Sequence, residues 1–111
     1  MYVRIARFEG VEPGGIDRQA EELRAALGAA RAGRVPEGIP EAAFRTLSEH
    51  TTRVVAVASR TDGVILDLVF TETEDDLQAV HEVLDTMSPA QGTGRRVSVE
   101  RYEVLADELM R

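Results

Sequence analysis

Two charged residues interrupt segments that otherwise have the composition of buried strands. Arg4 lies within the run YVRIA, and Asp67 lies within VILDLVF. A carboxylate in the middle of a central strand is unfavourable unless it is paired, and an arginine on a neighbouring strand is the expected partner. Together the two side chains could bind a phenolate or hold a general base. As a purely structural feature, they would form a buried ion pair that fixes the strand register.

The last predicted strand offers a tyrosine beside a carboxylate. Ser98, Glu100 and Tyr102 share one face of that strand if it is regular. The hydroxyl of Tyr102 could then donate a hydrogen bond to a substrate oxygen, with Glu100 as a further ligand-binding group. The alternative is an interface aromatic whose hydroxyl reaches solvent at the rim. We therefore take Arg4, Asp67 and Tyr102 as candidate catalytic residues.

The two histidines are candidate ligand-binding residues. Helical spacing places His81 beside Leu77 and Leu84, where it could ligate a haem iron or simply lie at the edge of the helix. His50 lies in a poorly patterned segment and could line the mouth of a pocket or belong to a loop. The separation of the two histidines does not match a metal site, and no carboxylates stand out to complete one. The sequence therefore predicts no metal and no cofactor.

Composition narrows the class of protein. The chain of 111 residues, 43% hydrophobic and 30% charged, is expected to form a single domain over 1–111. A formal net charge of −7, without a basic block, disfavours nucleic acid and membrane surfaces as partners. There is no cysteine for a disulfide and no lysine for a Schiff base. The opening MYVRIARF predicts a strand rather than a signal peptide, so a cytoplasmic location is expected.

The first half of the chain predicts a strand over 2–10 followed by a helix. The helix should start near Ile16, with Asp17 as its N-cap, and end at Gly33, because apolar residues recur between these positions at steps of three and four. Residues 34–52 have no clear period. A short helix and irregular chain are both compatible with that segment.

The second half predicts a hairpin, a helix and a last strand. Residues 53–59 and 64–70 are apolar runs, and the Asp-Gly pair between them favours a tight turn. Thr73, with Asp76 three residues later, has the spacing of a capping box at the start of the next helix. The remaining predicted features are a helix end at Ser88-Pro89, a glycine-containing loop at 91–94 and a last strand at 95–106.

The order βαββαβ is that of an α+β, ferredoxin-like fold with an antiparallel sheet and both helices on one face. Apolar side chains occur on both faces of the predicted strands, although the helices can cover only one. A second copy packed against the other sheet face would cover it, which predicts a homodimer. The apolar face changes within the last strand. This change predicts a bulge near Glu100–Arg101, either inside one subunit or where the strand end passes to the partner.

Three segments resemble a known family: MYVRIARFEG at 1–10, LVFTETEDDLQAV at 68–80 and GTGRRVSVERYEV at 92–104. They resemble small bacterial proteins of the antibiotic biosynthesis monooxygenase-like type, which belong to the dimeric α+β barrel superfamily. The resemblance covers most of the chain but not residues 34–52. It implies the dimer and a pocket between helices and sheet. Some relatives use this pocket for cofactor-free oxygenation of polycyclic phenols, and others use it for haem breakdown.

The oxygenation site of those relatives typically uses Asn and Trp side chains, and this sequence contains neither. The first hypothesis is therefore a small-ligand-binding or accessory protein on the same scaffold, with a small aromatic molecule as its ligand. The second is a cofactor-independent monooxygenase acting on a phenolic or quinone-type substrate, in which Arg4, Asp67 and Tyr102 bind and deprotonate a phenol. The third is a haem-binding protein.

Overall fold

The computed structural model describes residues 1–87 and 94–111. The strands are β1 (Tyr2–Glu9), β2 (Arg53–Ser59), β3 (Val64–Thr71) and β4 (Arg95–Glu103). The helices are α1 (Pro13–Arg31), α2 (Glu41–His50) and α3 (Glu74–Thr86). The predicted α+β class with a ferredoxin-like order is confirmed, and α2 is an additional helix between α1 and β2. None of the helices in the described ranges combines the length and apolar character that a membrane crossing needs.

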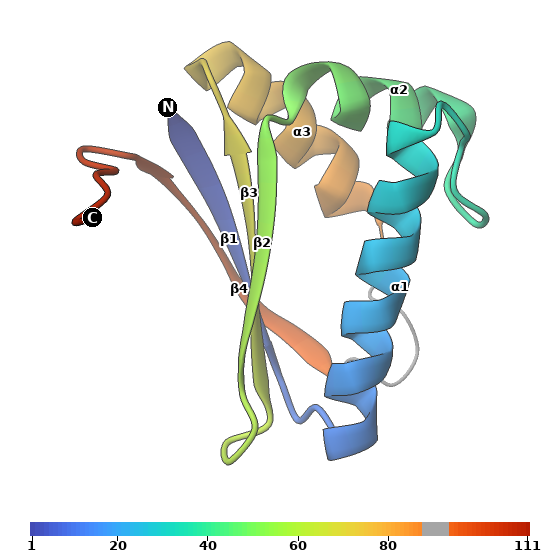
Figure 1. Ribbon diagram of the computed structural model, residues 1–111, viewed down its shortest axis with the longest axis vertical. Coiled ribbons are helices and arrows are strands. Elements are labelled where there is room, and N and C mark those ends of the chain that lie inside the picture. The colour runs from blue at the N-terminus through green and yellow to red at the C-terminus, as the bar shows by residue number, and fades with distance from the viewer. Residues whose placement is uncertain (88–93) are drawn as a thin grey trace.

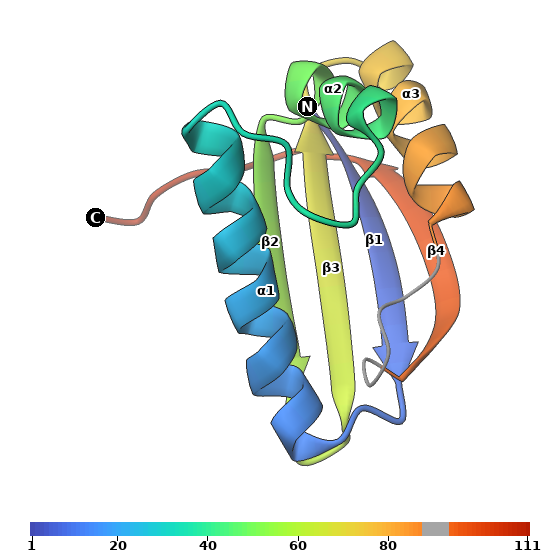
Figure 2. The same ribbon diagram turned by 90° about the vertical axis from the view of Figure 1, so that its right-hand side faces the viewer.

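The strands form one antiparallel sheet in the order β2-β3-β1-β4, so β1 and β3 are the central pair. All the labelled helices lie on one side of this sheet, with α1 along the β2 side and α3 along the β4 side (Figures 1 and 2). Alternate side chains of each strand face the helices, and the others face away. We call the second surface the open face. It carries Val3, Ile5, Arg7, Arg53, Val55, Val57, Ser59, Val64, Leu66, Leu68, Phe70, Ser98, Glu100 and Tyr102.

Helix α1 starts one turn earlier than predicted. Pro13 occupies its first turn, where a proline sacrifices no hydrogen bond and its fixed φ suits the helix, and Glu12 is the N-cap. Asp17 is therefore not the N-cap. Its Oδ1 instead lies 2.7 Å from Nη2 of Arg60 in the β2–β3 turn. The predicted helix end is confirmed, because Gly33 follows the helix with a φ of 75°.

The predicted cap of α3 is confirmed, since the backbone N–H of Asp76 donates to Oγ1 of Thr73 at 3.0 Å. Helix α2 occupies much of the segment whose pattern was compatible with either a short helix or irregular chain. The predicted helix end at Ser88-Pro89 lies outside the described residues. The same holds for the loop predicted at 91–94, apart from Gly94.

A bulge is present in β4, but at a different place from the predicted one. Val97 is the extra residue, because the pairing with β1 shifts between Arg96 and Ser98. Pairing is regular beyond Ser98, so the predicted bulge at Glu100–Arg101 is wrong. The bulge allows Arg96 and Val99 both to face the helices, although their spacing would put them on opposite faces of a regular strand.

The close-packed core lies at one end of the space between helices and sheet. Its buried cluster consists of Ala6, Phe8, Val11, Ile16 and Ile65, with Val99 packed against it. Helix α3 contributes Leu77 and Val80, which are both buried. Helix α1 has 19 residues, but only Gly15 and Ile16, close to its start, are buried. Beyond its first turn, α1 therefore does not close onto the sheet.

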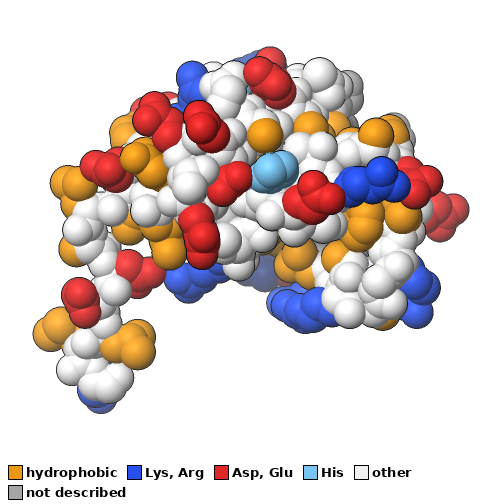
Figure 3. Space-filling view, turned by 90° about the horizontal axis from the view of Figure 1, so that it is seen from above, with side chains coloured by type: hydrophobic (Ala, Val, Ile, Leu, Met, Phe, Trp, Pro, Cys, Tyr) orange, Lys and Arg blue, Asp and Glu red, His pale blue; other side chains and the backbone are white. Residues whose placement is uncertain are grey.

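The residues after β4 form an extended tail, 104–111, that crosses the open face. The backbone N–H of Val104 donates to the Met1 carbonyl at 2.9 Å, which continues the pairing with β1. Oδ2 of Asp107 lies 3.9 Å from Nη1 of Arg53 on β2, the opposite edge strand, so the tail has crossed the sheet (Figure 2). The tail projects from the body of the protein with apolar side chains in solvent (Figure 3). Leu105, Leu109 and Met110 are 88%, 92% and 96% exposed.

The hairpin turn predicts a sharp difference between two glycine substitutions. Gly63 has a φ of 66°, and a Cβ there would lie 2.8 Å from the Val11 carbonyl oxygen. Gly63→Ala should therefore lower the free energy of unfolding by about 1–2 kcal/mol or more. Gly28 lies on the exposed side of α1 with open space around it, and Gly28→Ala should raise that free energy by about 0.5–1 kcal/mol. Urea denaturation measures both, and equal effects would contradict the close backbone approach at Gly63.

Candidate functional site

A cavity of about 780 Å³ lies between the helices and the sheet. Its size is within the range of pockets that hold small organic molecules. All the helices, the connection between α1 and α2, and strands β1, β2 and β3 contribute to its apolar wall. The apolar residues of the wall are Ala6, Phe8, Leu23, Ala26, Leu27, Ala30, Pro36, Ile39, Phe44, Leu47, Val54, Val69, Leu84 and Met87.

The cavity exists because α1 is held to the sheet mainly at its start. Ile16 is buried there, whereas Leu23 and Leu27, further along the same apolar stripe, are half-buried and face the cavity. Helix α2 lies across the far end of the sheet (Figure 2) and adds Phe44 and Leu47 to the wall. Most of the apolar stripe predicted for α1 is thus a cavity wall rather than part of a packed core.

Four buried polar atoms in the described part of the chain have no hydrogen-bond partner: Arg4 Nη2, Gln19 Oε1, Thr51 Oγ1 and Asp67 Oδ1. All four residues line this cavity. A buried polar group without a partner costs about 1–3 kcal/mol, and native structures contain few of them. Their concentration around one cavity marks it as the candidate ligand site.

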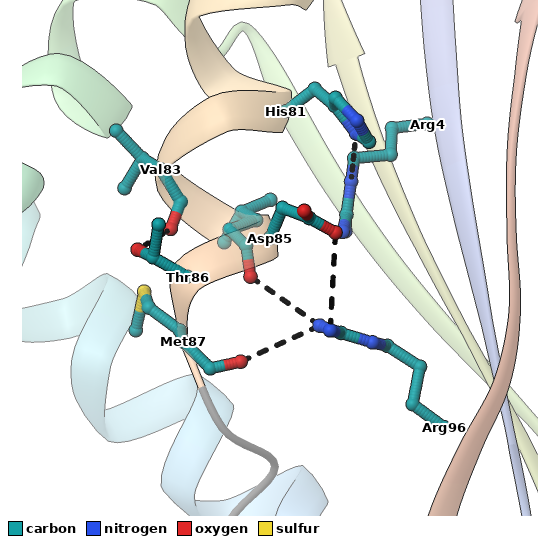
Figure 4. A network of polar contacts seen from close by, with 8 residues as sticks. Arg4, His81, Val83, Asp85, Thr86, Met87 and Arg96 are labelled. Atoms are coloured by element: carbon teal, nitrogen blue, oxygen red, sulfur yellow. Dashed lines mark hydrogen bonds and ion pairs between the residues drawn. The ribbon is translucent and has the colours of Figure 1, made fainter.

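Arg4 is the most deeply buried charge of the site, with 3% of its surface exposed. Its Nε donates to Nδ1 of His81 on α3 at 3.2 Å (Figure 4). Burial, and then the nearby charge of Arg96, lowers the pKa of Arg4. The pKa of His81 is also lowered, first by burial and then by the charges of Arg101 and Arg4. A neutral His81 keeps Nδ1 free to accept the hydrogen bond from Arg4.

Arg96 approaches the last turn of α3 from the neighbouring strand β4 (Figure 4). Its Nη1 lies 3.4 Å from the carbonyl oxygens of Leu84 and Met87, where it offsets the negative end of the helix dipole. Its Nη2 lies 3.9 Å from Oδ1 of Asp85. Arg4, by contrast, forms no ion pair with any carboxylate of the described residues, and residues 88–93 contain no acidic side chain.

Asp67 projects from β3 toward the helices. Nε2 of Gln19 on α1 donates to its Oδ2 at 3.2 Å, whereas its Oδ1 has no partner. Burial raises the pKa of Asp67, and the charge of Arg4 and the hydrogen bond from Gln19 offset part of that effect. The ionised carboxylate is consequently a stronger base than an exposed aspartate.

The direct ion pair expected between Arg4 and Asp67 does not form. In the register of β1 and β3, Arg4 pairs with Val69 and Asp67 pairs with Ala6. The two charged side chains are therefore diagonal neighbours, and each bonds a helix residue instead. The prediction of a cross-strand pair was wrong, although both residues do line the same cavity.

Tyr102 and Glu100 lie on the other side of the sheet. Both project from the open face, where the hydroxyl of Tyr102 donates to the carboxylate of Glu100. A molecule in the cavity of the same subunit is separated from them by the sheet. The structure therefore brings together two of the three candidate catalytic residues, Arg4 and Asp67, and leaves Tyr102 on the opposite face.

His50 links two helices rather than lining the cavity. Its Nδ1 lies 2.7 Å from Oδ1 of Asp76 at the start of α3, and this hydrogen bond lowers the pKa of Asp76. Neither His50 nor His81 is among the described residues that line the cavity. Over 1–87 and 94–111, no group of three or more histidine, aspartate or glutamate side chains could hold a metal ion.

Three residues of the site, Gln19, Thr51 and Arg96, are not singled out by the sequence. Gln19 lies beside the apolar stripe of α1, and Thr51 follows α2 in the segment that has no clear period. Arg96 stands in an Arg-Arg pair near the start of the last strand. The sequence did not indicate that Arg96 faces the helices, because its orientation depends on a bulge at the following residue and the predicted bulge was at Glu100–Arg101.

The chain matches no protein-family model and no curated protein. Its resemblance to antibiotic biosynthesis monooxygenase-like proteins therefore stays a prediction.

The raised pKa of Asp67 predicts how stability depends on pH. The folded protein holds this proton more tightly than the unfolded chain does. The stability due to Asp67 is therefore fully present below the unfolded pKa of about 4, and it is lost as the pH rises through the folded pKa. Asp67→Asn removes this loss, so the variant should gain stability relative to the wild type as the pH rises above about 4.

Urea denaturation at a series of pH values measures that difference. Glu37→Gln, at an exposed position in the connection between α1 and α2, is the matched control and should show a smaller change. A difference between Asp67→Asn and wild type that stays constant with pH would contradict the burial argument.

Proposed function

We propose that the protein binds a small, largely apolar molecule in the cavity between helices and sheet, and that it acts as a homodimer. The observation that supports ligand binding is the position of the four unpartnered buried polar atoms, all on residues that line one apolar cavity. Ligand pockets typically combine apolar walls with a few convergent polar groups. This cavity has that composition, and a small aromatic molecule suits its walls.

The homodimer is proposed from the open face. Its central part is formed by Ile5, Val55, Val57, Leu66, Leu68 and Phe70. Val57 is 47% exposed, although it is apolar and lies in a strand. A second copy is the occupant we infer, because a face-to-face pair would cover this surface and would give the apolar side chains of the tail 104–111 a surface to pack on.

A cofactor-independent monooxygenase is the second candidate, and one observation favours it. Asp67 lines the cavity, has a free Oδ1 and has a raised pKa. It could accept a proton from a phenol, while Arg4 stabilises the resulting phenolate and O₂ serves as the oxidant. Oxygen uptake with a hydroquinone-type substrate should then be at least about a hundredfold slower in Asp67→Asn. Uptake at the wild-type rate would exclude Asp67 as the base.

The cytoplasmic location expected from the sequence stays a prediction, as does haem binding through His81. The hydrogen bond from Arg4 already occupies Nδ1 of that histidine. The cavity supports the small-ligand proposal through different residues, Arg4, Gln19, Thr51 and Asp67.

Native mass spectrometry of the freshly purified protein tests both parts of the proposal. We expect a dimer that retains a small organic molecule. A dimer without an added mass would support the quaternary proposal and would favour an accessory role over ligand storage. A monomer at micromolar concentration would contradict the dimer.

Two adjacent substitutions locate the dimer interface in the same experiment. Val57→Glu places a carboxylate on the open face, and Ala58→Glu places one on the helix side of the same strand, where Ala58 is also exposed. Burial of an unpaired charge should raise the dimer dissociation constant of Val57→Glu by at least about tenfold. Ala58→Glu should stay dimeric. Equal dissociation of both variants would mean that the open face is not the interface.

A further inference from the structure

Basic side chains are in excess around the cavity, although the protein as a whole is acidic. The formal net charge of the chain is −7. The charged side chains on the helix side of the sheet that line the cavity are nevertheless basic in excess: Arg4, Arg31 and Arg96, against Glu22 and Asp67. Arg53 also borders the cavity, but its side chain projects from the open face, where it pairs with Asp107. A bound anion would therefore meet a local field opposite in sign to that of the whole protein.

Two of these arginines have little exposed surface. Arg4 is 3% exposed and has a free Nη2, and the side chain of Arg96 is 25% exposed. Both approach α3 from adjacent strands (Figure 4), Arg4 at His81 and Arg96 at the last turn, and the charge of Arg96 is near enough to lower the pKa of Arg4. Like charges that close are unfavourable when buried, unless an anion lies between or beside them.

The described carboxylates offset the charge of Arg4 without pairing with it directly. The charges of Asp85 and Asp67 both raise the pKa of Arg4, but neither carboxylate forms an ion pair with it, and the side chain of Asp85 is 59% exposed. Asp67 forms its hydrogen bond with Gln19. An anion bound in the cavity could therefore pair directly with the free Nη2 of Arg4.

The unpartnered atoms of Asp67 and Gln19 favour hydrogen-bond donors, whereas the two arginines favour an anion. Oδ1 of Asp67 and Oε1 of Gln19 are both acceptors without a partner, so they select a donor such as a hydroxyl or an N–H group. Arg4 and Asp67 are diagonal neighbours in the register of β1 and β3, and the Cβ atoms of such residues are roughly 7 Å apart. A molecule that satisfies both carries its acidic group and its donor several bonds apart on an apolar frame.

We propose that the ligand is an apolar carboxylic acid with a separate hydroxyl or N–H donor. Its carboxylate binds Arg4 and Arg96 beside the last turn of α3, and its donor binds Asp67 and Gln19. The apolar frame of the ligand lies along Leu84, Met87 and the α1 wall. This inference rests on the proposed ligand-binding function and specifies which class of molecule the cavity selects.

Isothermal titration calorimetry with three matched probes tests this assignment at neutral pH. 6-Hydroxy-2-naphthoate carries both groups at opposite ends of one ring system, 2-naphthoate lacks the hydroxyl, and 2-naphthol lacks the carboxylate. We expect 6-hydroxy-2-naphthoate to bind at least about tenfold more tightly than 2-naphthol, which is the effect of one hydrogen bond to a charged group. It should also bind more tightly than 2-naphthoate.

Substitutions of the two arginines test whether they bind the carboxylate of the probe. Arg96→Gln should weaken binding of 6-hydroxy-2-naphthoate by at least about tenfold and leave 2-naphthol unchanged. Arg4→Gln should do the same if it folds, and Arg96→Gln decides the question if it does not. Arg101→Gln removes a charge from the same strand at a residue bonded to Gln78, outside the described cavity wall, and is the control that should bind normally.

The outcomes separate this inference from the broader proposal. If 2-naphthol binds as tightly as 6-hydroxy-2-naphthoate, or if Arg96→Gln binds both equally well, the cavity is a ligand site and the carboxylate assignment is wrong. If none of the three probes binds at millimolar concentration, both the assignment and the ligand-binding function fail.

Discussion

The arrangement of this protein depends on one buried charge, the guanidinium of Arg4. It lies in a central strand, is almost inaccessible to solvent, and forms no ion pair with a described carboxylate. A guanidinium in that position needs partners for its donors. His81 satisfies Nε and thereby ties β1 to α3. Nη2 is also buried and has no partner, so tight apolar packing of the helices over Arg4 would be unfavourable, and the cavity lies there instead.

The sheet consequently has two faces that the rest of the chain covers only in part. On the helix side, α1 is buried at its first turn only, and the space that it leaves is apolar with a polar, cationic end. On the open face, a broad apolar surface is crossed by the tail 104–111, whose own apolar side chains are exposed. A bound ligand would fill the space on the helix side, and a second subunit would cover the open face. Because the sheet is shared, binding on one side and assembly on the other would stabilise the same strands.

Sequence patterns predicted the features that depend on local chemistry. Apolar runs located the four strands, Asp-Gly predicted the hairpin, and Thr73 marked the start of α3. Arg4 and Asp67 stood out because charges are rare in central strands, and both proved to line the cavity. The predictions that were wrong concern how segments distant in the sequence pair with one another. A diagonal register separated Arg4 from Asp67, and a bulge at Val97, rather than at Glu100–Arg101, set the faces of β4. The cavity itself depends on how α1 is oriented relative to the sheet, and no single residue of the sequence indicates that orientation.

Methyl-detected NMR during a titration with 6-hydroxy-2-naphthoate would report both surfaces of the sheet at once and so locate the ligand. We expect shifts at Leu23, Leu27 and Val69, which line the cavity, with smaller changes at Val55, Val57 and Leu66 on the open face. Shifts confined to the open face, or none at millimolar probe, would contradict a ligand site between the helices and the sheet.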